Sequence, residues 1–327
     1  MTLHPMLAAL LKHKAGVFLI GLQIALTLAI VCNILFIVGQ RVERVWRPTG
    51  LVESDLFMVT QTFIGAPGAD DQAAVEKLDS MQRTDLAALR GLPDVASATP
   101  INTLPLLRSR WGTSVGLQAD QQRGATQADT YTGGEQMLQS LGLQLVAGRD
   151  FTSTDVRHGA ESKITKPPVV IVTKALADRL FPHGDALGKP IYLGVNSVPS
   201  MIVGEVARML TSNPDENDAF AYHAVLIPLR IDAASTAYAV RSHPNRMAAA
   251  MREARKTLFR LDPLRIIPPG GRYNPEGIRT FAQIRSWGYA LDLFMVQVLS
   301  VICVILLVIT GVGMAGLTSF WVNQRHK

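Results

Sequence analysis

The chain is poor in cysteine, and its long middle segment has none. The two cysteines, Cys32 and Cys303, lie inside the two longest uncharged runs of the 327-residue sequence. The residues between those runs can therefore form neither a disulfide nor a thiolate metal site. A middle segment that needs no disulfides to fold is compatible with a bacterial periplasmic domain.

Charged residues are missing from two long stretches, residues 15–40 and 293–324. Each stretch exceeds the ~20 apolar residues that a helix needs to cross the core of a bilayer. The first is too long for a signal peptide and lacks a cleavage site with small residues. Because 48% of all residues are hydrophobic, which is high for a soluble protein, we predict two transmembrane helices over these ranges.

Acidic residues are absent from both ends of the chain. All 26 Asp and Glu residues lie between the two uncharged runs, whereas Lys12, Lys14, Arg325 and Lys327 lie outside them. The positive-inside rule places those ends in the cytoplasm, and a long middle segment can translocate regardless of its charge. The segment between the runs lacks the clustered basic excess that a nucleic-acid surface needs, so we predict no nucleic-acid partner.

Residues 1–14 have an amphipathic helical pattern that can lie along the inner membrane surface and contact lipid. The residues that define this predicted membrane-surface helix are Leu7, Leu10, Leu11, Lys12 and Lys14. The alternative is a frayed terminus whose lysines only set the topology. At the other end, residues 325–327 are predicted to be cytoplasmic.

Strand-like and helix-like patterns alternate along the middle segment. Alternation of apolar and polar residues predicts strands, and helical apolar spacing bounded by stop signals predicts helices. The predicted strands cover residues 56–62, 110–119, 189–195, 200–206, 222–229 and 236–242; helices cover 70–90 and 245–263, and a strand runs into a helix over 167–181. We predict an α+β periplasmic domain, with two lobes, over residues 41–274, inserted between the two transmembrane helices. Residues 275–292 are predicted to form a stalk helix that leads into the second span.

The stretch GVGMAG near the end of the chain matches the G-x-G-x-x-G fingerprint of dinucleotide binding. That fingerprint needs a preceding strand and an acidic residue about 20 positions later. Here it lies inside the second uncharged run, where small residues allow a neighbouring helix to approach closely. We therefore predict no cofactor, and we predict that Gly311, Gly313, Ala315 and Gly316 pack against a neighbouring helix.

The stretch GTSVG (residues 112–116) matches the nucleophile elbow of hydrolases. That motif needs a sharp turn from strand to helix that exposes the serine. Here the strand alternation continues through Ser114, and the polar residues that follow have no apolar helical face. We predict a serine on an edge strand and no catalytic residue, with a membrane-anchored hydrolase as an alternative.

The histidines lack the spacing of metal ligands, because none is three or four residues from another and none neighbours a cysteine. We predict no metal site; the seven histidines are His4, His13, His158, His183, His223, His243 and His326. The acidic cluster of Asp215, Glu216 and Asp218 lacks the alternating ligands of a calcium loop, which predicts a solvated loop. The sequence also has no P-loop.

Several stretches together resemble the permeases of MacB/FtsX-type ABC transporters. These stretches are residues 143–155 (LQLVAGRDFTSTD), 167–194, 201–209 (MIVGEVARM), 238–263 and 313–327. They follow the order and spacing of the family over most of residues 143–327. Residues 9–29 also look like the family's opening segment.

The resemblance implies a multi-pass protein of the bacterial inner membrane with a large periplasmic domain between its first two spans. Members of the family form homo- or heterodimers and pair with a cytoplasmic ATP-binding cassette subunit, which binds the ATP. The spans transmit its movement to the periplasmic domain for export or efflux, in some members with a periplasmic adaptor. The permease itself is not an enzyme and binds no cofactor.

The resemblance also implies further spans, because the family's permeases continue past the second span. The sequence stops where the cytoplasmic coupling segment of the family would begin, so we expect that the natural polypeptide is longer. A two-span receptor or sensor with a periplasmic ligand-binding domain is the alternative, and it would need a signalling module after the second span.

Overall fold

The computed structural model describes residues 14–67, 72–109, 111–159, 166–213, 219–270 and 276–323. The chain divides into two units, one of Met1–Arg47 with Tyr289–Lys327 and one of Pro48–Gly288. Three predicted features lie outside the described residues. They are the surface helix with Leu7, Leu10, Leu11 and Lys12, the acidic cluster at 215–218, and the end at 325–327; Lys14 begins the first described helix, but its side chain is not described.

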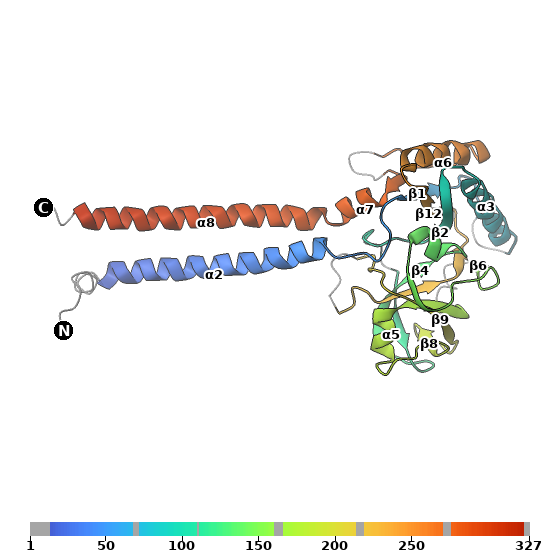
Figure 1. Ribbon diagram of the computed structural model, residues 1–327, viewed down its shortest axis with the longest axis horizontal. Coiled ribbons are helices and arrows are strands. Elements are labelled where there is room, and N and C mark those ends of the chain that lie inside the picture. Colours follow the sequence, from blue (N-terminus) through green and yellow to red (C-terminus); the bar gives the residue numbers. More distant parts are fainter. Residues whose placement is uncertain are drawn as a thin grey trace. The chain divides into compact units, whose positions relative to one another are not determined.

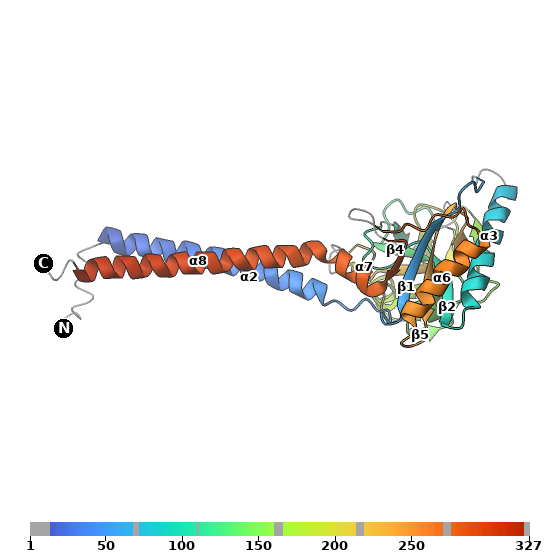
Figure 2. The same cartoon turned by 90° about the horizontal axis from the view of Figure 1, so that it is seen from above.

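The first unit contains two long antiparallel helices, α2 (Lys14–Val45) and α8 (Ala290–Asn323). They lie side by side in both views (Figures 1 and 2). The stretches Phe18–Val45 and Ala290–Gly316 are long and apolar enough to cross a membrane. Neither helix contains a proline, which would interrupt its hydrogen bonds, so each uncharged run continues as one helix.

The second unit, hereafter the domain, contains two main sheets. The first sheet has four antiparallel strands in the order β13 (Ile278–Thr280), β1 (Leu56–Thr62), β12 (Ser235–Ser242) and β2 (Val95–Ile101). Helices α3 (Gln72–Arg90) and α6 (Met247–Leu261) pack on one of its faces (Figure 2). We call this sheet with its helices the first lobe.

The core of the first lobe follows from strand alternation. Phe57, Val59, Tyr238 and Val240 point to the same face and pack against Leu86, Leu89, Ala250, Ala254 and Leu258 of the helices. Burying one large apolar side chain contributes ~1.5–3 kcal/mol. The face with this core is therefore covered by α3 and α6, while residues of the opposite parity, such as Met58 and Ala237, line a cavity on the other face.

The second sheet has seven strands and closes on itself. Its order is β5 (Leu145–Gly148), β9 (Ser200–Val206), β7 (Val169–Thr173), β10 (Ala224–Ile227), β4 (Thr126–Thr132), β3 (Gly112–Gly116) and β8 (Pro190–Leu193). Because β8 also pairs with β9, the six strands from β9 to β8 form a closed barrel. The strand β5 pairs with β9 on the same side as β8, but further along β9. Closure leaves few exposed strand edges. Together with α5 (Lys174–Leu180), which follows β7, this barrel forms the second lobe.

Short elements complete the domain. A parallel ribbon of β6 (Arg157–Gly159) and β11 (Leu229–Ile231) forms a third, two-stranded sheet. Helices α4 (Met137–Leu141) and α7 (Phe281–Gly288) are both short. The prediction of a mixed domain with two lobes is confirmed by the two main sheets.

The predicted single helix over 275–292 is wrong. Residues 278–280 form β13, residues 281–288 form α7, and α8 begins at residue 290. A reciprocal cap starts α7, because Thr280 N–H donates to Gln283 Oε1 at 2.8 Å and Gln283 N–H donates to Thr280 Oγ1 at 3.2 Å. The pairing of β13 with β1 holds residues 278–280 in an extended conformation before this cap.

Two of the stretches that resemble the family meet where β5 pairs with β9. Gly148 and Gly204 stand opposite each other in this pairing. A Cβ on Gly148, which has a φ of +77°, would lie 2.3 Å from Val203 O, and a Cβ on Gly204 would lie 2.5 Å from Arg149 O. Both positions therefore need glycine for this close approach of two backbones.

Candidate functional site

One carboxylate holds together the segments through which the chain enters and leaves the domain. Thr49 Oγ1 donates to Glu53 Oε1 at 2.7 Å, and Arg285 Nη1 forms an ion pair with the same oxygen at 2.7 Å. Thr49 and Glu53 follow α2 in the chain, and Arg285 lies on α7, which precedes α8. We call Thr49, Glu53 and Arg285 the clamp.

Backbone contacts fix both segments to the rest of the domain. Leu210 N–H donates to Thr49 O at 2.8 Å, directly after the start of the domain. At the other end, Arg108 Nη2 donates to Gly288 O at 3.3 Å. The first and last residues of the domain are thus hydrogen-bonded to loops of the domain. The clamp is therefore connected to the rest of the domain through hydrogen bonds.

The helix pair has polar contacts at two levels. Near the middle of both helices the hydroxyl oxygens of Thr27 and Thr310 lie 2.9 Å apart. At the end of α2 and the start of α8, Asp292 accepts from Arg41 at 2.5 Å and lies 3.7 Å from Arg44. An acidic residue in the first turn of α8 and basic residues in the last turns of α2 also complement the dipoles of the two helices.

Of the four small residues predicted to pack against a neighbouring helix, Gly313 lies against α2. A Cβ on Gly313 would lie 3.0 Å from Gln23 Nε2, whereas among the described residues no atom lies within 4 Å of a Cβ on Gly311 or Gly316. Ala315 is also exposed. Packing of Gly311, Ala315 and Gly316 against another helix stays a prediction.

The two enzyme-like motifs lie in regular elements. GVGMAG lies within the uninterrupted helix α8 and has no preceding strand. Ser114 lies in the middle of β3, opposite Gln127 of β4, and its carbonyl accepts from Gly194 N–H at 2.8 Å. Because β3 has β4 on one side and β8 on the other, the prediction of an edge strand is wrong. A continuous strand also lacks the sharp turn of a nucleophile elbow.

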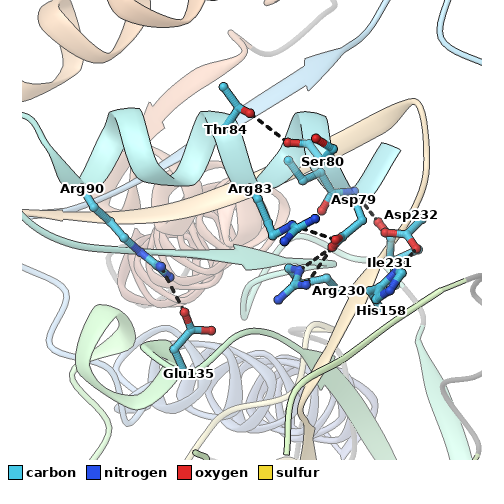
Figure 3. Close-up of polar contacts among 11 residues, drawn as sticks. Asp79, Ser80, Arg83, Thr84, Arg90, Glu135, His158, Arg230, Ile231 and Asp232 are labelled. Carbon is cyan, nitrogen blue, oxygen red and sulfur yellow. Dashed lines mark hydrogen bonds and ion pairs between the residues drawn. The ribbon is translucent and has the colours of Figure 1, made fainter. Parts of the chain in front are cut away.

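A group of charged side chains lies between α3 and the β6–β11 ribbon (Figure 3). Asp79 of α3 accepts from Arg230 at 2.7 Å and from Arg83 at 2.8 Å. His158 Nδ1 of β6 lies 2.9 Å from Asp232 Oδ2, which follows β11. We call Asp79, Arg83, His158, Arg230 and Asp232 the α3 network. Spacing along the sequence did not indicate it, because its members come from three distant segments.

The electrostatics of the α3 network are set by burial. Burial raises the pKa of the Asp232 carboxyl above its usual value, and the charge of Asp79 adds to the rise, while His158 and Arg230 oppose it. Asp232 is 2% exposed. A carboxylate that is buried so fully needs a positive or hydrogen-bonding partner to stay ionised.

A cavity of about 330 Å³ lies on the face of the first sheet that is away from its helices. Its described lining is apolar or neutral and includes Met58, Thr60 and Ala237 of the first sheet with Trp111, Leu229 and Ile231. The cavity is small by the standard of ligand pockets, which measure about 300–1,000 Å³. It offers room for a small neutral molecule at most.

A two-lobed mixed domain between two paired helices, each long and apolar enough to cross a membrane, defines a class of membrane-anchored proteins with one large folded domain. A family model described as the MacB-like periplasmic core domain matches residues 24–257. The chain therefore belongs to the family of proteins with a MacB-like periplasmic core domain, which is a domain of permeases of the ABC-transporter type. No relative was found among the curated proteins.

Three solved structures are similar to this chain. The periplasmic region of MacB from Actinobacillus actinomycetemcomitans has 17% identity and a TM-score of 0.42, with 72% of this chain and 93% of that chain covered. The extracellular domain of the noncanonic ABC-type transporter YknZ from Gram-positive bacteria has 13% identity, a TM-score of 0.39 and coverages of 68% and 98%. A domain of a permease protein from Porphyromonas gingivalis has 16% identity, a TM-score of 0.35 and coverages of 69% and 95%. The family assignment rests on the family model.

Proposed function

We propose that this protein is the permease subunit of a MacB/FtsX-type ABC transporter in the bacterial inner membrane. A separate cytoplasmic ATP-binding cassette subunit binds and hydrolyses ATP. The helix pair carries the resulting movement to the domain in the periplasm, which drives export or efflux. The working unit is a dimer with a second permease protomer, and its spans contact membrane lipid.

The observation that carries the proposal is the family match over residues 24–257, which begins inside α2 and covers most of the two-lobed domain. An enzyme or a nucleic-acid-binding protein would not account for that match. The same match favours a permease over the receptor alternative, because the family's domain belongs to transporters of the ABC type.

Short connections support transmission of movement. Two residues separate Val45, the end of α2, from Pro48, where the domain begins, and one residue separates α7 from α8. An extended residue spans at most ~3.6 Å, so such connections can absorb only a few ångströms of displacement. A larger shift of either helix must move the clamp, because Thr49, Glu53 and Arg285 lie within a few residues of these connections.

Co-purification tests the proposal. We expect the natively expressed protein, isolated in a mild detergent, to carry a bound ATP-binding cassette subunit, and mass spectrometry of the complex to show two permease protomers. An unrelated two-span membrane protein purified in the same way controls for contamination. Isolation of the chain without any ATPase, even after mild chemical cross-linking in whole cells, would contradict the proposal and favour a receptor. The same sample would also reveal a periplasmic adaptor.

A further inference from the structure

We propose that Asp79, His158 and Asp232 form a binding site for a divalent transition metal, with Zn²⁺ as the best-fitting ion. Each of the three residues offers one ligand atom, and these atoms all lie within 4.8 Å of one another. Figure 3 shows His158 and Asp232 paired beside each other and Asp79 close by, where it contacts Arg83 and Arg230. This site is independent of the proposed transport function.

The local topology brings the three residues together. In the parallel β6–β11 ribbon His158 stands opposite Arg230, and Asp232 N–H donates to Gly159 O at 2.9 Å, so His158 and Asp232 are held side by side. Gln82 Nε2 of α3 donates to Ile231 O at 2.6 Å, one turn of the helix after Asp79. The backbone therefore fixes the separation of the ligands before any metal binds.

A buried oxygen in this cluster has no donor. The Asp232 side chain is 0% exposed, and its Oδ1 has no hydrogen-bond partner among the residues that the structure describes. Leaving a buried acceptor unsatisfied destabilises the folded state, and more so when the group is charged. A cation bound to the Asp232 carboxylate would compensate the charge of a group that its hydrogen bonds leave half satisfied. The orphan oxygen is the observation that separates this cluster from an ordinary surface group of acidic residues.

The ligand distances fit a small coordination sphere. His158 Nδ1 and Asp232 Oδ2 lie 2.9 Å apart. In a tetrahedral zinc site with bonds of about 2.0–2.1 Å, neighbouring ligand atoms lie roughly 3.3 Å apart, so a small opening of this pair admits the ion. One imidazole and two carboxylates form a mixed nitrogen and oxygen donor set, which suits Zn²⁺ or a neighbouring transition metal better than Ca²⁺ or Mg²⁺.

The arginines of the α3 network have different roles towards a metal. Arg230 donates through two nitrogens to Asp79 Oδ1, at 2.8 and 2.7 Å, and its side chain is 15% exposed. It can stay in place and orient the carboxylate from behind, as residues around metal ligands commonly do. Arg83 binds the other oxygen, Asp79 Oδ2, from a side chain that is 63% exposed. Because an exposed ion pair is weak, Arg83 can leave Oδ2 to the metal.

The test uses the full chain without a tag, stripped with a chelator and titrated with ZnCl₂ by calorimetry. We expect one Zn²⁺ per chain, and we expect His158→Gln to weaken binding at least tenfold. His183→Gln, at an exposed histidine outside the cluster, is the matched control and should bind like the wild type. Thermal melts without Zn²⁺ show whether each variant folds; because His158 is 35% exposed, its replacement leaves the core intact.

Two further measurements sharpen the test. Arg83→Gln removes a competitor for Asp79 and should tighten Zn²⁺ binding roughly twofold to fivefold, the range expected from an exposed ion pair. Co²⁺ should give the visible absorption of a four-coordinate site in the wild type and lose it in His158→Gln. Absence of Zn²⁺ binding, or binding that His158→Gln leaves unchanged, would overturn the proposal and leave the cluster as an ion-pair network.

Discussion

The domain and the helix pair differ in what they bury. The domain buries charged side chains as pairs, whereas the helix pair leaves most of its large apolar side chains exposed. In the domain, Asp85 and Arg265 form an ion pair with both side chains 2% exposed, and Gln61 and Tyr238 bond to the same carboxylate oxygen. In the helix pair, the buried apolar cluster consists of Val31, Ile34 and Cys303, while residues such as Phe18 (71%) and Phe36 (65%) are exposed. The buried charges of Asp85 and Arg265 are satisfied inside the domain, whereas the exposed apolar side chains of the helix pair fit an apolar surrounding.

This difference has a mechanical consequence. In the domain, one sheet closes into a barrel and the buried Asp85–Arg265 pair joins elements of the first lobe, so we expect the domain to resist internal deformation. Among its described residues, the helix pair is held by one apolar cluster and a few polar contacts, so we expect its helices to shift against each other at lower cost. A shift is therefore expected to move the domain as a body through the clamp, not to unfold it.

The largest expected effect concerns the buried ion pair of the first lobe. Asp85→Ala leaves Arg265 buried without its partner, which should lower the free energy of unfolding by about 3–5 kcal/mol. Asp178→Ala, which removes the exposed partner of Lys174, should have little effect. Urea unfolding of the full chain in detergent, followed by circular dichroism, measures both. Equal losses of stability in the two variants would show that burial of the Asp85–Arg265 pair does not determine its contribution. The double change Asp85→Leu with Arg265→Met should recover most of the stability that Asp85→Ala loses.

The next effect concerns the helix pair alone. Gly313→Leu places a large side chain where a Cβ already meets Gln23, and it should weaken the pairing of α2 with α8 by about 1–3 kcal/mol. Gly311→Leu, at an open position, is the control. The readout is oxidative cross-linking of Thr27→Cys with Thr310→Cys after replacement of Cys32 and Cys303. The cross-link should fall in Gly313→Leu and persist in Gly311→Leu, and an equal loss in both would refute the assignment of Gly313 to this pair.

The third prediction concerns the clamp, whose residues lie next to the connections between the helix pair and the domain. Arg285→Gln should cost less than about 1 kcal/mol of stability, since Arg285 and Glu53 are partly exposed. It should nevertheless reduce the ATP-driven movement of the domain. Arg90→Gln breaks the comparably exposed Arg90–Glu135 pair elsewhere in the domain and should leave that movement intact. Loss of movement in both variants, or in neither, would remove the clamp from the transmission path.

The smallest expected effect is the contribution of Asp155 to the stability of the domain, and this contribution depends on pH. Arg149 donates to Asp155, and the Asp155 pKa lies well below its usual value because of this bond and the hydrogen bonds from Thr152. The contribution of Asp155 to stability is therefore present at pH 7 and is lost progressively below about pH 4, where the unfolded carboxyl becomes protonated. The wild type should be more stable than Asp155→Asn at pH 7, and the gap in urea unfolding should narrow at pH 2.5. A gap that stays constant would show that the carboxylate charge is not responsible.

Local sequence patterns predicted the strands and helices whose apolar residues follow the regular spacing of their own secondary structure. The alternation in residues 56–62 and 200–206 matches β1 and β9 in both bounds, and the predicted helices over 70–90 and 245–263 contain α3 and α6. By contrast, β2 and β4 escaped prediction. β2 contains Pro100, and β4 is largely polar, so their strand conformation depends on neighbours far away in the sequence.

The candidate sites were predictable only in part, for a geometric reason. Successive helical residues are rotated by about 100°, so Gly311 and Gly313 cannot both face α2, and a motif read as a string of letters does not reveal which one does. The clamp and the α3 network join residues that are far apart along the chain. His158 and Asp232 meet because of the parallel pairing of β6 with β11, and the contact of Gln82 with Ile231 O holds α3 with Asp79 beside them; no local pattern indicates either contact.

The most direct test of the account is a distance measurement between protomers during ATP turnover. One spin label on Arg252→Cys, at an exposed position of α6 in a chain without Cys32 and Cys303, reports the separation of two domains in the assembled complex. We predict that trapping the ATPase subunit with ATP and vanadate shifts this distance. An unchanged distance in a complex whose ATPase is shown to be trapped would contradict the transmission of movement from the cytoplasm to the domain.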